Sequence, residues 1–179
     1  MYLIITASPN IDGLTAACAK AYAAGLDKAG GKWEHYDLCE RKISPCLVCG
    51  NGWGVCRETS KCAVDDIFTE IQIRTRSAKG IALITPVYWS QPSERMKYFL
   101  DRFRRCDSLL KETPATKDKQ IDLIAAAGGS GNGTVQCLAE MEMWCRHVCA
   151  IPKDRIGITK FNREPMLAAI TDAAVRIVS

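Results

Sequence analysis

The chain alternates short apolar segments with longer segments of helical spacing, and this alternation constrains the fold more than any other feature. Short apolar runs are typical of buried parallel strands, and apolar residues three to four positions apart are typical of helices. We predict strands at residues 2–6, 33–38, 80–85, 120–126 and 155–159. We predict helices at residues 14–29, 65–77, 93–105, 134–149 and 164–178. Such a chain belongs to the α/β class, and we expect one three-layer, doubly wound domain over residues 1–179 with a five-stranded parallel sheet in the order 2-1-3-4-5.

The composition excludes several classes of protein. A length of 179 residues fits one domain, and 47% hydrophobic with 25% charged residues is ordinary for a globular protein. The net charge of +4 is small, so we expect no nucleic-acid partner. No apolar run approaches the roughly 20 residues of a membrane span, and no basic residue precedes Lys20. We therefore expect a cytoplasmic protein without a membrane segment or a secretion signal.

Ten cysteines are the unusual part of the composition. Because a reducing compartment disfavours disulfides, we expect metal-binding or redox cysteines instead. Four of them lie in a Cys-rich insertion at about residues 39–64: Cys46, Cys49, Cys56 and Cys62. Four thiolates suit a metal, either an iron–sulfur cluster or a zinc ion. Redox thiols, or cysteines left from a lost cluster, are the alternatives.

The loops that follow the strands should share one edge of the sheet, where doubly wound proteins bind their ligands. We expect the cysteine insertion at this edge too. The first loop joins a buried strand to a helix start, and its backbone N–H groups and hydroxyls suit a phosphate. The loop runs from Ser8 through Asn10, Gly13 and Leu14 to Thr15, and the hydroxyls of Ser8 and Thr15 can add donors. The alternative is an ordinary capped helix, because such polar residues are common caps.

Two further loops at this edge carry aromatic and glycine residues. Two adjacent aromatic side chains after the third strand can form a wall for a flat ligand, and the candidates are Pro86, Val87, Tyr88 and Trp89. Glycines after the fourth strand let a ligand approach the backbone closely, and the candidates are Gly128, Gly129, Ser130 and Gly131. The alternatives are aromatic packing against helices or a subunit, and an ordinary tight connection for the glycines.

The remaining cysteines and several charged residues are expected to be structural. Cys145 and Cys149 lie four positions apart on an apolar helical face, where a free cysteine packs as a small hydrophobe. The other cysteines are isolated in the sequence: Cys18, Cys39, Cys106 and Cys137. We expect three arginines of the helix at 93–105 to form a solvated face: Arg95, Arg102 and Arg105. His35 and His147 lie far apart, so we expect no Ser–His or Cys–His catalytic pair.

Residues 85–102 resemble the signature segment of flavodoxin-fold, FMN-binding NAD(P)H reductases. The matching positions are Pro86, Tyr88, Ser93, Lys97, Phe99, Asp101 and Arg102. The segment from Cys62 to Ile67 is similar to the end of the Cys-rich stretch in the branch called iron–sulfur flavoproteins. The loop that begins at Ser8 is similar to the family's phosphate loop. The resemblance covers nearly the whole chain, and it implies a flavodoxin-like domain.

The resemblance implies a bound FMN. The phosphate would be held by Ser8, Asn10, Gly13 and Thr15, while residues 86–89 would flank the isoalloxazine ring and residues 128–131 would close its other side. A [4Fe-4S] cluster would be bound by Cys46, Cys49, Cys56 and Cys62. Two features depart from the family. A basic residue usually stands in place of Asn10 and an Asn in place of Leu14, and the cluster branch usually has two residues between its second and third cysteines, where this chain has six.

We therefore predict an FMN-dependent oxidoreductase that couples the flavin to a cluster. Its electron donor or acceptor would be a small molecule or a ferredoxin, with NAD(P)H as the candidate donor. A cluster-free NAD(P)H:quinone or FMN reductase is the first alternative. A non-catalytic flavodoxin-like module, whose cysteines are structural or bind zinc, is the second. The resemblance also implies assembly as a homodimer or homotetramer.

Overall fold

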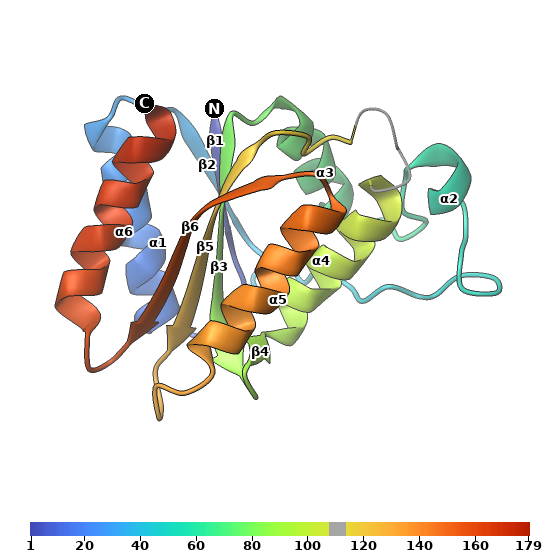
Figure 1. Ribbon diagram of the computed structural model, residues 1–179. Helices are drawn as coiled ribbons and strands as arrows, with labels where there is room; N and C mark the ends of the chain where they lie inside the picture. The colour runs from blue at the N-terminus through green and yellow to red at the C-terminus, as the bar shows by residue number, and fades with distance from the viewer. Residues whose placement is uncertain (108–113) are drawn as a thin grey trace.

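The computed structural model describes residues 1–107 and 114–179. Within these residues the chain forms a six-stranded sheet between two layers of helices (Figure 1). The strands are β1 (Tyr2–Thr6), β2 (Trp33–Asp37), β3 (Gly80–Tyr88), β4 (Gln91–Pro92), β5 (Gln120–Ala127) and β6 (Ile151–Thr159). Five strands are parallel in the order β2-β1-β3-β5-β6, and the short β4 pairs antiparallel with β3.

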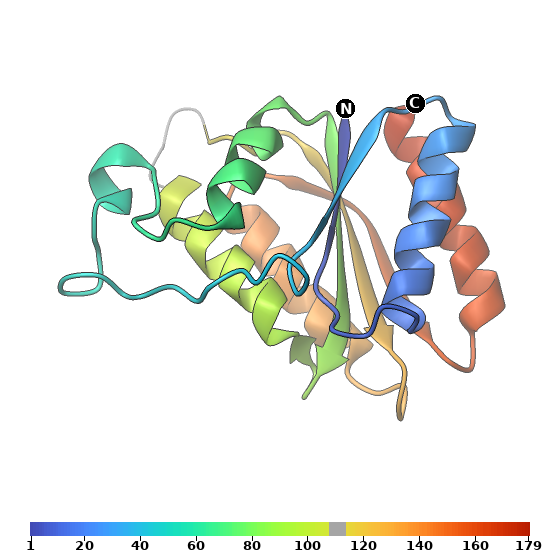
Figure 2. The same cartoon turned by 180° about the vertical axis from the view of Figure 1, so that it is seen from behind.

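Helices cover both faces of the sheet. They are α1 (Leu14–Lys28), α2 (Cys56–Thr59), α3 (Ile67–Ser77), α4 (Glu94–Asp107), α5 (Thr134–His147) and α6 (Arg163–Val178). Figures 1 and 2 show α1 and α6 on one face and α3, α4 and α5 on the other. The predicted α/β, doubly wound architecture is therefore confirmed. Among the described residues, no helix combines the length and the apolar character needed to cross a bilayer.

Alternating side chains of the strands divide the interior into two cores. In β1, Leu3 and Ile5 pack on the α4 side, where the rings of Phe99 and Phe103 lie 5.5 Å apart. Ile4 packs on the opposite side with Tyr22 of α1. Because successive residues of a strand point to opposite faces, a strand buried on both faces must be apolar throughout. This explains the continuous apolar runs of the sequence.

The strand count differs from the prediction of five. The chain continues β3 past Pro86 to Tyr88 and then turns back to form β4. Pro86 ended the predicted strand because proline lacks an N–H donor, yet here it is paired in register with Ala126. β6 also begins at Ile151, four residues before its predicted start at Arg155.

The prediction that Cys149 shares an apolar helical face with Cys145 is wrong. Helix α5 ends at His147, and Cys149 adopts a left-handed backbone with a φ of 57°. Its side chain is exposed, whereas Cys145 is buried. The spacing of four residues predicts a shared helical face, but the helix ends before it reaches the second cysteine.

Candidate functional site

The loop between β1 and α1 is ordered by its own polar groups. The backbone N–H of Asn10 donates to Ser8 Oγ at 3.2 Å, and the N–H of Asp12 donates to Asn10 Oδ1 at 3.2 Å. Helix α1 begins after Gly13, which has no side chain to accept a bond from the first-turn N–H groups, and that turn carries no acidic residue. Unoccupied N–H groups and the positive end of the helix dipole suit a phosphate. The buried Thr15 lies in this same turn.

The hairpin between β3 and β4 holds an aromatic residue in an unusual backbone conformation. Trp89 and Ser90 have φ values of 48° and 63°, although a bulky residue rarely adopts positive φ. The Trp89 side chain is nevertheless 99% exposed and its neighbour Tyr88 is 40% exposed. Two positive φ values are typical of the tightest hairpin loops. The turn therefore presents a rigid and unpartnered aromatic surface, and backbone strain of this kind concentrates at functional sites.

Two contacts tie this hairpin to the neighbouring loops. Ser93 Oγ donates to the carbonyl of Ala7 at 2.7 Å, and Ser93 N–H donates to Thr85 Oγ1 at 3.0 Å. On the other side, a Cβ added to Gly133 would lie 2.7 Å from the Cα of Ser90, so only glycine allows this approach. The three loops predicted from the sequence therefore meet at one edge of the sheet. We call this edge the flavin rim and define it by residues 8–15, 86–90 and 128–133.

The glycine loop of the flavin rim leaves space beside the hairpin. Gly128 and Gly129 are exposed, and a Cβ added to either would meet no atom within 4 Å. A flat ligand could therefore lie against the backbone at this point without displacing a side chain. The binding roles of the rim residues remain predictions.

A cleft of about 410 Å³ opens at the rim. It is lined by Ala7, Pro9, Cys39, Tyr88, Ser93, Glu94, Arg95 and Tyr98. Arg95 donates to the carbonyl of Ile43 at 2.5 Å, and its guanidinium lies 5.7 Å from the ring centre of Tyr98. The prediction of a solvated Arg95 is therefore wrong. Cys39, expected to be isolated and structural, also faces this cleft, and burial followed by the charge of Asp37 raises the pKa of its thiol.

The four cysteines of the insertion do not lie at the rim, which corrects the prediction. The chain leaves the rim after β2 and packs against the carboxyl-terminal half of α4, as Figures 1 and 2 show for α2. There Cys46, Cys49, Cys56 and Cys62 line one small cavity of about 20 Å³. We call this cavity the thiol pocket. Cys106 of α4 lines it as a fifth thiol, and it lies about 16 Å along the helix axis from Arg95.

Arg102 joins the cysteine segment to α4. Its fully buried guanidinium donates to Asp66 Oδ2 at 2.7 Å and to Cys62 Sγ at 3.3 Å. It also donates to the carbonyls of Ser44 and Val64 at 3.1 and 3.2 Å, and it lies 4.3 Å from the ring centre of Phe68. The prediction of a solvated Arg102 is therefore wrong. Burial opposes ionisation of Asp66, but bonds from Arg102 and from two backbone N–H groups outweigh it and lower the carboxyl pKa.

Arg105 makes a second connection one turn further along α4. It donates to the carbonyl of Gly52, and its guanidinium lies 5.0 Å from the ring centre of Trp53. The expectation that Arg105 belongs to a solvated face is therefore also wrong. Two arginines facing thiols would offset the negative charge of thiolates bound to a metal. Cys106, like Arg102 and Arg105, could not be associated with this pocket from the sequence, because α4 is distant along the chain from the other four thiols.

The thiol pocket supplies the right donor atoms for an iron–sulfur cluster, but its cavity is too small to hold one. Five cysteines supply more thiols than a [4Fe-4S] cluster requires. A cavity of about 20 Å³ has room for about one water molecule. Within residues 1–107 and 114–179, no three His, Cys, Asp or Glu side chains are placed to hold a metal ion. Burial, followed by the charges of Cys62 and Cys56, raises the pKa of the Cys106 thiol to about 12.

A doubly wound parallel sheet that gathers a polar strand-to-helix loop, an exposed aromatic hairpin and an open glycine loop at one edge is the architecture of a flavodoxin-like protein. Comparison with protein families makes the assignment specific. The chain belongs to the NADPH-dependent FMN reductase family, whose model matches residues 2–162.

Two relatives are described as iron–sulfur flavoproteins. One, from Methanocaldococcus jannaschii, is 30% identical over 100 residues, which cover 56% of this chain and 50% of that protein. The other, from Methanosarcina thermophila, is 29% identical over 119 residues, which cover 65% of this chain and 58% of that protein. The matches thus span little more than half the length of these relatives.

Solved structures agree on the fold. A NAD(P)H:quinone oxidoreductase from Methanothermobacter marburgensis superposes with a TM-score of 0.71 at 17% identity, covering 99% of this chain and 96% of that one. A flavone reductase superposes with a TM-score of 0.74 at 16% identity, covering 99% of this chain and 62% of that one. At these identities the likeness establishes the flavodoxin-like fold alone.

Proposed function

We propose that this protein is an FMN-dependent oxidoreductase that takes electrons from NAD(P)H. The observation that carries the proposal is the convergence of three loops at the flavin rim. One loop offers unoccupied helix N–H groups, one presents Trp89 in a strained backbone, and one exposes bare glycine backbone. Membership of the NADPH-dependent FMN reductase family supports the same cofactor and donor.

Each loop of the rim has a distinct task in this proposal. The first holds the phosphate through Ser8, Asn10, Gly13, Leu14 and Thr15. Residues 86–89 flank the ring, and residues 128–131 let it approach the backbone. Bound FMN supplies the chemistry, because it accepts a hydride or single electrons. The protein residues bind and orient the ring, and the exposed side of the rim leaves room for a nicotinamide to stack on it.

Flavin titration tests the proposal directly. The purified protein should bind FMN, and the double substitution Tyr88→Ala with Trp89→Ala should weaken binding by about 1 to 3 kcal/mol because the aromatic wall is lost. The matched control is Ile73→Ala, an exposed apolar residue of α3, which should leave FMN affinity unchanged. A protein with no affinity for FMN would refute the function, and an unaffected double variant would remove the hairpin from the site.

We further propose a [4Fe-4S] cluster at Cys46, Cys49, Cys56 and Cys62. The five clustered thiols, the two arginines beside them and the names of the relatives support it. Anaerobic purification should yield iron, sulfide and a broad absorbance shoulder beside the flavin bands. Cys56→Ser should remove iron and sulfide and leave FMN bound, whereas Cys149→Ser, an exposed thiol elsewhere, should change neither. Retained iron in Cys56→Ser would contradict this ligand set.

A cluster-free flavin reductase is the second candidate, and the closed thiol pocket favours it. A cavity of about 20 Å³ must open before a cluster can enter. Flavin absorbance without iron or sulfide in anaerobically purified protein would decide for this candidate. In that case the clustered cysteines would serve packing, and electrons would pass between NAD(P)H and a small acceptor at the rim alone.

A further inference from the structure

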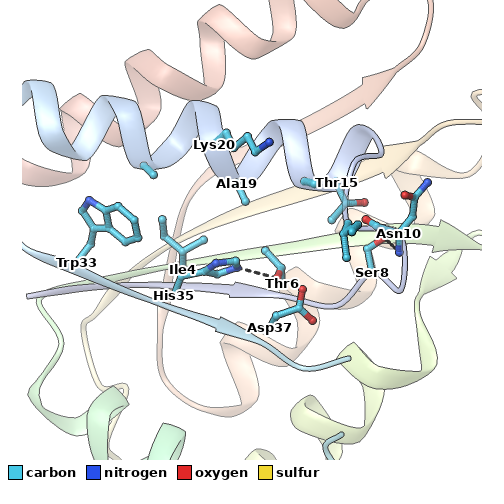
Figure 3. Close-up of a pocket in the computed structure, with 13 residues that line it drawn as sticks. Ile4, Thr6, Ser8, Asn10, Thr15, Ala19, Lys20, Trp33, His35 and Asp37 are labelled. Atoms are coloured by element: carbon cyan, nitrogen blue, oxygen red, sulfur yellow. Dashed lines mark hydrogen bonds between the residues drawn. The ribbon is translucent and has the colours of Figure 1, made fainter. Parts of the chain in front are cut away.

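A groove separate from the rim cleft runs between α1 and the edge of the sheet (Figure 3). Its volume is about 220 Å³, and three residues of β2, the edge strand, line it. The α1 wall consists of small residues, Ala16, Ala19 and Ala23, which leave room above the strands. The strand wall is formed by Ile4, Thr6, Trp33, His35 and Asp37. Neither the proposed ring site nor the thiol pocket includes this strand wall.

One end of the groove is a fixed aromatic surface. Trp33 is 36% exposed, and its indole N–H donates to Asp27 Oδ1 at 2.8 Å. Asp27 belongs to the last turn of α1, so this bond fixes the indole against the end of that helix. A planar and partly exposed indole beside small side chains suits stacking with a flat heterocycle.

The middle of the groove carries hydrogen-bonding groups. His35 Nε2 and Thr6 Oγ1 share a bond of 2.8 Å, which fixes the orientation of the imidazole. Burial lowers the pKa of His35 against the opposing charges of Asp37 and Glu40, which favours the neutral imidazole. Asp37 Oδ1 accepts from the N–H groups of Cys39 and Glu40, which fixes this carboxylate at the end of β2. Both residues can meet the polar edge of a base or a ribose.

The other end of the groove is cationic and adjoins the phosphate loop. Lys20 is exposed and forms no ion pair among the residues that the structure describes. Helical side chains lean toward the helix amino end, and in Figure 3 the ammonium of Lys20 points toward Thr15. Ser8 and Asn10 line the same end. Because the loop itself has no basic residue, Lys20 is the cation that adjoins it in this groove.

We propose that the groove binds an adenosine phosphate, the non-reacting half of the NAD(P)H donor. The base lies against Trp33, the ribose faces His35 and Asp37, and a phosphate meets Lys20 beside the flavin rim. This inference rests on the proposed function for the identity of the donor. The cavity, its aromatic wall and its lysine support a nucleotide site whatever the identity of the donor.

Calorimetric titration of the FMN-loaded protein with ADP and with 2′,5′-ADP tests the inference. At least one of the two should bind, and each of Trp33→Ala and Lys20→Gln should weaken it about tenfold or more. Lys28→Gln, an exposed lysine at the far end of α1, is the matched control and should bind as the unmodified protein does. Trp33→Ala should keep its FMN affinity, because Trp33 lies at the end of the groove away from the rim.

Three results would overturn the inference. They are no binding of either nucleotide, binding that neither substitution weakens, and displacement of FMN by the nucleotide, which would make the groove part of the flavin site. Failure of the proposed function is distinguishable, because it appears as a lack of FMN binding in the separate flavin titration. If FMN does not bind, the same two nucleotides and three variants test the groove in the flavin-free protein.

Discussion

The flavin rim and the cysteine segment both follow strands of the same sheet, but they are held in different ways. The rim loops are short, begin directly at buried strands and contact one another through Ser93 and Gly133. The segment at residues 39–64 is long, and side chains of α4, chiefly Arg102 and Arg105, connect it to the rest of the molecule. Backbone connections therefore position the rim, whereas hydrogen bonds from two arginine side chains hold the cysteine segment.

Removal of Arg102 should separate the two regions most clearly. Arg102→Ala leaves Asp66 and two carbonyls without their buried donor, and we expect a loss of about 3 to 5 kcal/mol in the free energy of unfolding. Urea unfolding measures this loss, and thiol labelling should show faster reaction of Cys62. Arg57→Ala, at an exposed arginine of α2, is the control and should change stability by less than about 0.5 kcal/mol. If FMN affinity falls as steeply as stability, the regions are not independent.

Acid should act with opposite sign on two carboxyl groups, Asp122 in β5 and Asp66, which holds the arginine that contacts the cysteine segment. Burial raises the pKa of Asp122 in β5 to about 6, despite bonds from Tyr22 and the N–H of Asp154. The folded protein therefore holds this proton more tightly than the unfolded chain, and lowering the pH from 7.5 to 4.5 should add about 2 kcal/mol through this group. Asp66 has a lowered pKa, so its contribution is present above its usual value of 3.8 and is lost only as the pH falls further.

The control for this pH effect is Asp122→Asn, which does not titrate. Its Oδ1 can accept from the N–H of Asp154 as the carboxylate does, and its NH2 group can donate to the Tyr22 hydroxyl in place of accepting from it. The urea midpoint of the variant should lack the gain that the unmodified protein shows between pH 7.5 and 4.5. An identical pH profile in both proteins would assign the effect to other carboxyl groups.

Alanine substitutions at two rim glycines should differ in effect, because Gly133 is tightly packed and Gly128 is in open space. Gly133→Ala places a Cβ 2.7 Å from Ser90 at a φ of 84°, and we expect a loss of about 1 to 2 kcal/mol in the free energy of unfolding. Gly128→Ala meets no atom within 4 Å and should change stability by less than about 0.5 kcal/mol. Its added methyl group should instead weaken FMN binding. Unchanged FMN affinity in Gly128→Ala would place the ring away from this backbone.

The sequence predicts the rim well because its signals are local. The apolar strand at residues 2–6, the turn residues after it and the glycines after β5 each act within a few positions of the chain. The predicted loops therefore lie together once the strands are parallel. The structure departs from the predicted rim in the continuation of β3 through Pro86 and in the short β4, because these depend on pairing across the hairpin. It also departs at Arg95 and Cys39, which line the cleft.

The cysteine segment could not be predicted in the same way, because its partners are distant in sequence. The helical pattern of residues 93–105 puts Arg102 on the polar face, and only contacts with Ser44, Cys62 and Asp66 show that this face is buried. The fifth thiol, Cys106, was unpredictable for the same reason. The groove between α1 and β2 is likewise not predictable from the sequence, since Lys20, Trp33 and His35 come from two separate elements and form no motif.

Helix α4 connects the rim to the cysteine segment. The helix is preceded by Ser93, which donates to the carbonyl of Ala7 just after β1, and its second half carries Arg102 and Arg105, which donate to the cysteine segment. The length and the twist of α4 therefore set the distance between the rim and the cysteine segment and their orientation about the helix axis. One residue inserted between Ser93 and Arg102 would rotate the second half of α4 by about 100° about its axis. Arg102 and Arg105 would then lose the cysteine segment, while the rim loops would keep their structure.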